Sequence, residues 1–64
     1  MTFKQLKKRF EELDYDVKYK VGIEGRGYYI RKFGDVSFAF KKSRDSVEHL
    51  LDTLQFESDF INSL

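Results

Sequence analysis

Few side chains in this sequence could hold a metal ion. His49 is the only histidine, and Asp45 and Asp52 flank it at the spacing of one helical turn. One imidazole and two carboxylates lack the further converging ligand that a zinc or transition-metal site needs. We therefore expect a solvated helix face here, and no metal ion or other cofactor.

Catalytic chemistry has equally little support. The chain has no cysteine, and no serine stands in the glycine-flanked context of a nucleophile turn. Glu11 and Glu12 are adjacent, so their side chains point apart on a helix and do not form a general acid–base pair. We expect a protein that is not an enzyme.

Residues 22–27, Gly-Ile-Glu-Gly-Arg-Gly, have the glycine density of a phosphate-binding loop. Such a loop presents its amides to phosphate at the N-terminus of the helix that follows it. Here a strand-like segment follows, and the Lys-Ser/Thr signature is missing. These glycines are therefore predicted to shape a turn, with Arg26 at its tip available to an acidic partner.

The elements that must position any site are most clearly patterned over residues 15–41. Apolar and charged residues alternate over 15–21, the period of a half-buried strand. Two further strands are expected over 28–30 and 36–40, separated by turns that contain glycine. The segment is therefore predicted to form a three-stranded antiparallel meander.

The first turn is expected to have two residues, at 24–25. It would pair Val21 with Tyr28 and Tyr19 with Ile30. All four side chains would then lie on one apolar face of the sheet.

The second turn can close in two ways. A two-residue loop at 34–35 would place Arg31 on the apolar face, where an unpaired charge costs several kcal/mol. A three-residue loop over 32–34, with its glycine in the left-handed conformation, pairs Ile30 with Val36. We predict the second loop, because it keeps charge off the apolar face.

The predicted sheet has one apolar and one polar face. Phe38 and Phe40 belong to the apolar face, and Arg31 lies opposite Asp35 on the polar one. The polar face as a whole would show Lys18, Lys20, Tyr29, Arg31, Ser37, Ala39 and Lys41.

One helix is expected before the sheet and one after it. Thr2 and Gln5 fit a capping box, after which apolar residues recur every three or four positions. Ser43 or Asp45 can cap the second helix, which is expected to bend or break near Ser58. Each helix has one apolar stripe, so both should cover the apolar sheet face. The predicted fold is α+β, two-layered, with the order α-β-β-β-α.

Composition indicates a single small domain, residues 1–64. A chain this short buries only about 60% of its unfolded surface, so its stability is marginal without good packing or self-association. It has no apolar run of the ~20 residues that span a bilayer, and no signal-peptide pattern. The lack of cysteine argues against a secreted disulfide scaffold. We expect a cytoplasmic protein of bacterial or phage type.

Charge is unevenly distributed along the chain. All 12 Lys and Arg lie within residues 1–44 together with six acids, a balance of +6. Residues 45–64 carry five acids and no Lys or Arg, a balance of −5 with His49 neutral. The net charge of +1 therefore conceals a basic part and an acidic part.

The basic sheet face is one candidate site, for nucleic acid. Its charge attracts phosphates, and an aromatic ring could stack on a base. The alternative is a solvated face on which Asp16 and Asp35 offset two charges. The candidate nucleic-acid residues are Lys18, Lys20, Arg26, Tyr29, Arg31 and Lys41.

The element order is similar to that of the double-stranded RNA-binding domain. In that family a basic pair opens the second helix, and the loop after the first strand reaches the minor groove. Here Lys41 and Lys42 precede the second helix, and residues 25–27 occupy that loop. The family's Gly-Pro-x-His loop is absent, its Lys-Lys-x-Ala-Lys pattern is matched by the lysine pair alone, and acidic residues replace its Ala-rich second helix. The resemblance covers the order of elements along the whole chain, but no motif.

The acidic C-terminal segment indicates a different function, protein binding. Residues 47–54 already supply the second layer of a thin core, which leaves further apolar side chains without a place. The alternative is a C-terminal turn that folds back to close the core. We predict a non-enzymatic domain that binds a protein or itself, with nucleic acid as the alternative partner and no membrane or small-molecule ligand. The candidate protein interface consists of Phe56, Phe60, Ile61 and Leu64.

Overall fold

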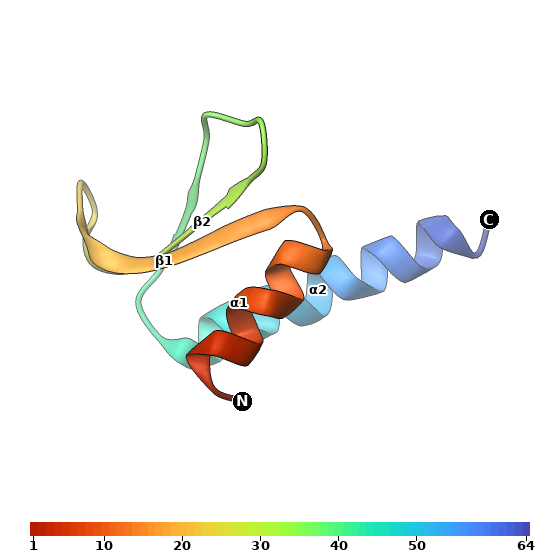
Figure 1. Cartoon of the computed structure of the whole chain (residues 1–64), viewed down its shortest axis with the longest axis horizontal. Helices are drawn as coiled ribbons and strands as arrows, with labels where there is room; N and C mark the ends of the chain where they lie inside the picture. The colour runs from red at the N-terminus through yellow and green to blue at the C-terminus, as the bar shows by residue number, and fades with distance from the viewer.

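Two helices and a three-stranded antiparallel sheet make up the chain, which the computed structural model describes over residues 1–64. The strand order is β1-β2-β3, and both helices cover one face of the sheet, as predicted (Figure 1). The elements in chain order are α1 (Phe3–Glu12), β1 (Tyr15–Gly22), β2 (Gly25–Lys32), β3 (Ala39–Lys41) and α2 (Arg44–Asn62).

The start of α1 is the predicted capping box. The side-chain oxygen of Thr2 accepts a hydrogen bond from the Gln5 amide at 3.2 Å, and the Gln5 side chain accepts one from the Thr2 amide at 2.9 Å. These bonds satisfy donors that the first helical turn leaves free. One turn apart, Leu6 and Phe10 are completely buried, which fixes the face that α1 turns to the sheet.

A tight corner joins α1 to β1. Asp14 has φ 67°, in the left-handed region that aspartate tolerates better than most residues. Its carbonyl accepts a hydrogen bond from the Phe33 amide at 2.8 Å. The corner is therefore tied to the end of β2, which helps to hold α1 against the sheet.

The core lies between the sheet and the two helices. Val17 and Ile30 face each other across β1 and β2, and both are at most 2% exposed. Burial of a side chain of this size contributes about 1.5–3 kcal/mol, so a core this small depends on every member. Its buried residues are Leu6, Phe10, Val17, Tyr28, Ile30, Val47 and Leu51.

The first hairpin has a different register from the predicted one. Tyr19 lies opposite Tyr28, whereas it was expected opposite Ile30, and every other expected pair of this hairpin is wrong by the same two residues. The turn residues are 23–24, one place earlier than expected, and Gly25 follows with φ 104°. A left-handed glycine directly after two ordinary turn residues is a common way to close a hairpin. Because the predicted and observed pairings differ by an even number of residues, each side chain still lies on the face of the sheet that was predicted for it.

β3 pairs with β2 three residues later along the chain than predicted. Ala39 lies opposite Ile30, so the expected pairing of Val36 with Ile30 is wrong. The predicted left-handed glycine is confirmed, with Gly34 at φ 85°. The loop nevertheless continues to Phe38 before the strand begins.

This odd shift exchanges the two faces of β3. Ala39 and Lys41 lie on the side of the helices, so their predicted place on the polar face is wrong. Phe38 and Phe40, predicted for the core, instead pack against Tyr29 on the opposite side. The small Ala39 packs against the core beside α2, where a phenylalanine ring would hold the helix away from the sheet.

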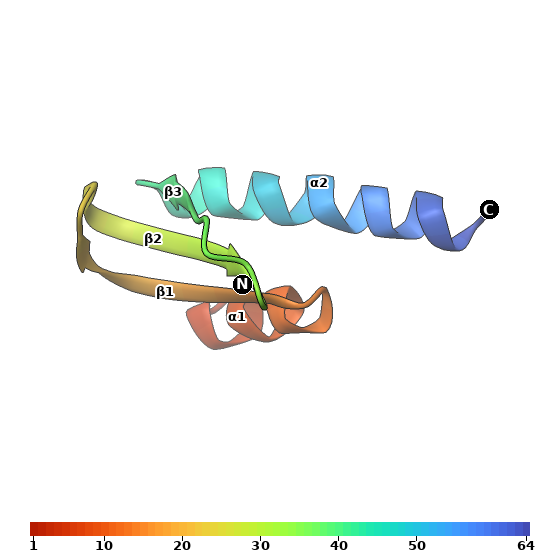
Figure 2. The same cartoon turned by 90° about the horizontal axis from the view of Figure 1, so that it is seen from above.

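α2 is one unbroken helix, and the expected bend near Ser58 is wrong. Of the two candidate caps, Ser43 is the one used, because its hydroxyl accepts a hydrogen bond from the Ser46 amide at 3.1 Å. Val47 and Leu51 are buried against the sheet. The last turns of α2 extend past the sheet at one end, and the β1–β2 hairpin extends past the helices at the other (Figures 1 and 2).

Arg44 fastens the start of α2 to the rest of the domain. Its Nε donates a hydrogen bond to the Tyr28 hydroxyl at 3.1 Å, and a terminal nitrogen donates to the Met1 carbonyl at 3.0 Å. The guanidinium also lies 5.6 and 5.7 Å from the ring centres of Tyr28 and Phe3. One side chain thus links α1, β2 and α2.

We expect Asp14→Gly to raise the free energy of unfolding by about 0.5–1 kcal/mol, because glycine adopts a positive φ without steric cost. Lys8→Gly, at an exposed position within α1, should instead lower it by about 1 kcal/mol. Urea denaturation measures both changes. Equal losses in the two variants would contradict the left-handed corner.

Candidate functional site

The side of the sheet that the helices leave open, here called the outer face, is the candidate site. All three strands and the loop before β3 contribute to it. Its residues are Asp16, Lys18, Lys20, Gly22, Gly27, Tyr29, Arg31, Phe38 and Phe40.

Tyr29 lies at the centre of this face and is only 7% exposed. The centre of its ring is 5.2 Å from that of Phe38 and 5.0 Å from that of Phe40, distances typical of aromatic packing. Its hydroxyl accepts a hydrogen bond from the Glu24 amide at 3.1 Å and donates one to the Gly25 carbonyl at 2.6 Å. The side chain therefore connects the aromatic cluster to the hairpin turn.

Two strand glycines make room for these rings. A Cβ atom on Gly22 would lie 2.7 Å from the Tyr29 ring, and one on Gly27 would lie 2.5 Å from the Phe40 ring. The rings thus lie directly over bare backbone, an arrangement known to compensate for glycine in strands. Both glycines were predicted only to shape the turn. Their position in the sequence, close to aromatic strand residues, could have indicated that they also make room for the rings.

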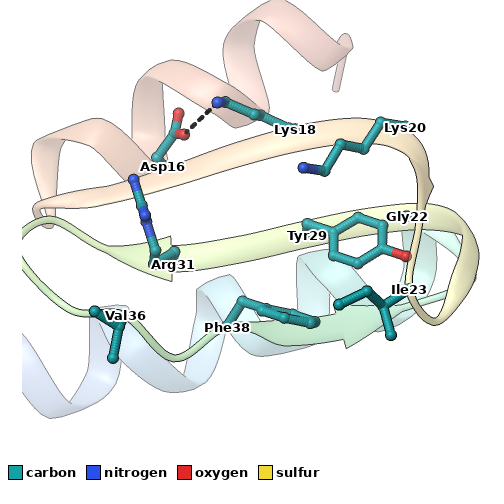
Figure 3. Close-up of a pocket in the computed structure, with 9 residues that line it drawn as sticks. All are labelled: Asp16, Lys18, Lys20, Gly22, Ile23, Tyr29, Arg31, Val36 and Phe38. Carbon is teal, nitrogen blue, oxygen red and sulfur yellow. Dashed lines mark ion pairs between the residues drawn. The ribbon is translucent and has the colours of Figure 1, made fainter.

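A shallow depression of about 270 Å³ lies beside the aromatic cluster (Figure 3). Basic side chains lie along its β1 side, and exposed apolar side chains lie along its β3 side. Its lining consists of Asp16, Lys18, Lys20, Gly22, Ile23, Tyr29, Arg31, Val36 and Phe38.

The depression is surrounded by more positive than negative charge. Lys18 and Asp16 form an ion pair at 3.9 Å, exposed enough to be worth less than about 1 kcal/mol. The Lys20 ammonium lies 5.3 Å from the centre of the Tyr29 ring. With Arg31 also on this face, three bases oppose one acid, so the depression favours anionic groups.

The expected pairing of Arg31 with Asp35 is wrong. Arg31 lies opposite Asp16 on β1. The carboxylate of Asp35 accepts a hydrogen bond from the Ser37 amide at 3.0 Å, within the long loop. Asp35 became a loop residue because the loop is longer than predicted.

Four of the six predicted nucleic-acid residues meet on the outer face, namely Lys18, Lys20, Tyr29 and Arg31. By their strand pairing, Arg26 and Lys41 lie on the opposite side of the sheet. The Tyr29 ring is covered, and the ring that remains accessible is that of Phe38, 43% exposed. Phe38 was missed as a site residue because the predicted register of β3 placed it in the core.

The predicted protein interface lies at the far end of α2. Phe56, Phe60, Ile61 and Leu64 are all more than half exposed, so the alternative in which the C-terminal segment folds back over the core is wrong. Phe56 comes nine residues after the buried Val47, which is two and a half helical turns. It therefore projects from the side of α2 opposite the core, and Phe60 follows one turn later.

No three histidine, aspartate or glutamate side chains come together in a way that could hold a metal ion. Neither helix combines the length and the apolarity needed to cross a membrane.

The fold and the outer face together define a small α+β domain with an open, basic and partly aromatic sheet face. Comparison with known proteins gives no match among family models, curated proteins or solved structures. The function must therefore be argued from the surfaces of the domain itself.

Tyr29→Phe should lower the free energy of unfolding by about 1–2 kcal/mol, since it removes the two hydrogen bonds at the turn and keeps the ring. The control is Tyr19→Phe, because the Tyr19 hydroxyl makes no hydrogen bond and its side chain is 54% exposed. It should change stability by less than about 0.5 kcal/mol. Similar effects of the two variants in thermal unfolding would show that the Tyr29 hydroxyl does not form these hydrogen bonds.

Gly27→Ala should destabilise the domain by about 1–3 kcal/mol, because the added methyl group meets the Phe40 ring and the Lys41 carbonyl oxygen. At an ordinary strand position the same change gains stability. The matched control is Arg26→Ala, at the exposed neighbouring position. A Gly27→Ala variant that is as stable as the unmodified chain in urea denaturation would rule out this register of β3.

Proposed function

We propose that this chain is a non-enzymatic interaction domain whose outer face binds an acidic, apolar segment of a protein. The observation that carries this proposal is the depression, with bases on one side and exposed apolar side chains on the other. A ligand with both carboxylates and apolar side chains satisfies both sides at once.

The apolar side supplies the affinity. Ile23 and Val36 are each about nine-tenths exposed and lie on either side of Phe38, which packs on the covered Tyr29 (Figure 3). Removing such side chains from water is worth about 25 cal/mol per Å² of apolar surface. Because the Phe38 ring is already packed against Tyr29, little side-chain freedom is lost when a ligand covers it.

The basic side supplies the selectivity. Lys18, Lys20 and Arg31 attract carboxylates and repel basic segments. Since these side chains are exposed, the attraction should weaken as salt screens it.

A single-stranded nucleic acid is the second candidate ligand, because Phe38 could stack on one base while the lysines contact phosphates. One feature favours a polypeptide. The accessible apolar surface on either side of Phe38 is aliphatic, from Ile23 and Val36, and does not stack on further bases.

The test is titration of ¹⁵N-labelled protein with an alanine-based helical peptide that carries Glu and Phe on one face. We expect amide shifts at the outer face, no binding of the analogue with Lys in place of Glu, and at least tenfold weaker binding by Phe38→Asp. Phe33→Asp is the matched control, because Phe33 is similarly exposed and lies outside the depression.

Oligothymidylate serves as the competing probe. If it shifts the outer-face amides and the acidic peptide does not, the ligand is a nucleic acid and the proposal of a protein ligand is wrong. If neither probe shifts them, the outer face is only a solvated surface.

A further inference from the structure

We infer that the segment bound by the outer face is α2 of a second copy of this chain, so that copies associate head to tail. This inference rests on the proposed function, because it names the partner of the same face. It is carried by the chemistry of the exposed side of α2.

α2 presents acids and aromatic rings on one exposed side, here called the acidic stripe. Phe56 follows Asp52 by four residues, and Asp59 and Phe60 follow Phe56 by three and four, so all four lie on one side of the helix. All are exposed, and no lysine or arginine follows Arg44 in the chain. The acidic stripe consists of Asp52, Phe56, Asp59 and Phe60.

The aromatic members of this stripe have no partner within the chain. Phe56 and Phe60 pack against no other ring and lie outside the core cluster. They lie in the last two turns of α2, and this end of the helix extends past the sheet (Figure 2). Helices in proteins gain most of their stability from packing of their apolar side chains, so a partner that covers these two rings would also stabilise the end of α2.

The acidic stripe and the outer face are complementary in both charge and apolar character. The stripe carries carboxylates beside two phenylalanines, and the outer face carries Lys18, Lys20 and Arg31 beside Phe38. Contact between two acidic stripes, or between two outer faces, would bring like charges together. The favourable pairing is therefore between unlike surfaces.

The two surfaces cannot meet within one copy. The outer face points away from the core on the sheet side, and the stripe lies on the side of α2 opposite the buried Val47. Each copy that binds through one surface leaves the other free. Such a heterologous contact extends into rings or filaments, and does not close as a two-fold dimer.

The test uses two variants that each remove one surface, Phe38→Asp on the outer face and Phe60→Asp on the stripe. Phe60 is 59% exposed and Phe38 is 43% exposed, and Phe38 also packs on Tyr29. Circular dichroism therefore checks that each variant folds before its association is measured. In sedimentation velocity the average mass of the unmodified chain should rise with concentration, and fall in about 1 M salt, where the Debye length is ~3 Å. Each variant alone should remain monomeric.

The decisive sample is an equimolar mixture of the two variants. One intact outer face and one intact stripe remain, so the mixture should form a one-to-one dimer and nothing larger. A mixture that stays monomeric while the unmodified chain associates would overturn the head-to-tail arrangement. Phe33→Asp should associate like the unmodified chain.

Failure of this inference can be told apart from failure of the proposed function. If the unmodified chain stays monomeric but binds the acidic peptide through Phe38, the partner is another acidic protein and self-association is wrong. If the chain neither associates nor binds the peptide, both proposals fall.

Discussion

The hydroxyl of Tyr29 fixes where the first hairpin turns, and the outer face depends on it. By bonding to the Glu24 amide and the Gly25 carbonyl, it holds the ring down along the sheet. The rings of Phe38 and Phe40 then pack against it, which determines how the third strand joins the second. Two hydrogen bonds at a turn thus organise an aromatic cluster on the side of the sheet that the helices do not cover.

The domain consequently has apolar packing on both sides of β2. Ile30 and Tyr28 face the helices, while Tyr29 anchors the cluster on the open side. A chain of this length cannot build a thick core, and rings packed over strand glycines cover further backbone without a third layer of elements. The same rings hold the binding surface in shape before any ligand arrives, which lowers the entropy lost on binding.

Local sequence patterns predicted much of this structure. They failed where contacts between residues far apart in the sequence determine the strand register. Capping residues and periodicity correctly placed both helices and the faces of β1 and β2, and with them Lys18, Lys20 and Arg31. The position of β3 was wrong because its register depends on rings that pack on Tyr29, not on the glycine of the loop. Because that error was odd, Phe38 was assigned to the core and missed as a site residue. The unbroken α2 was also missed, since Ser58 resembles a helix start yet remains within the helix.

The two-residue difference between the predicted and observed registers of the first hairpin reflects a property of the sequence of β1. β1 repeats the pattern Tyr-x-Val twice, so sliding it by two places replaces valine with tyrosine, and tyrosine with valine, yet leaves an apolar side chain at each of these positions on the helix side. Burial alone therefore distinguishes neighbouring registers poorly, which is local frustration in the folding landscape. A hairpin that forms early with the wrong offset must reopen before α2 can dock on Val17 and Ile30. The choice between competing registers is made at the tip of the hairpin, where a single tyrosine hydroxyl reaches its partners in only one of them.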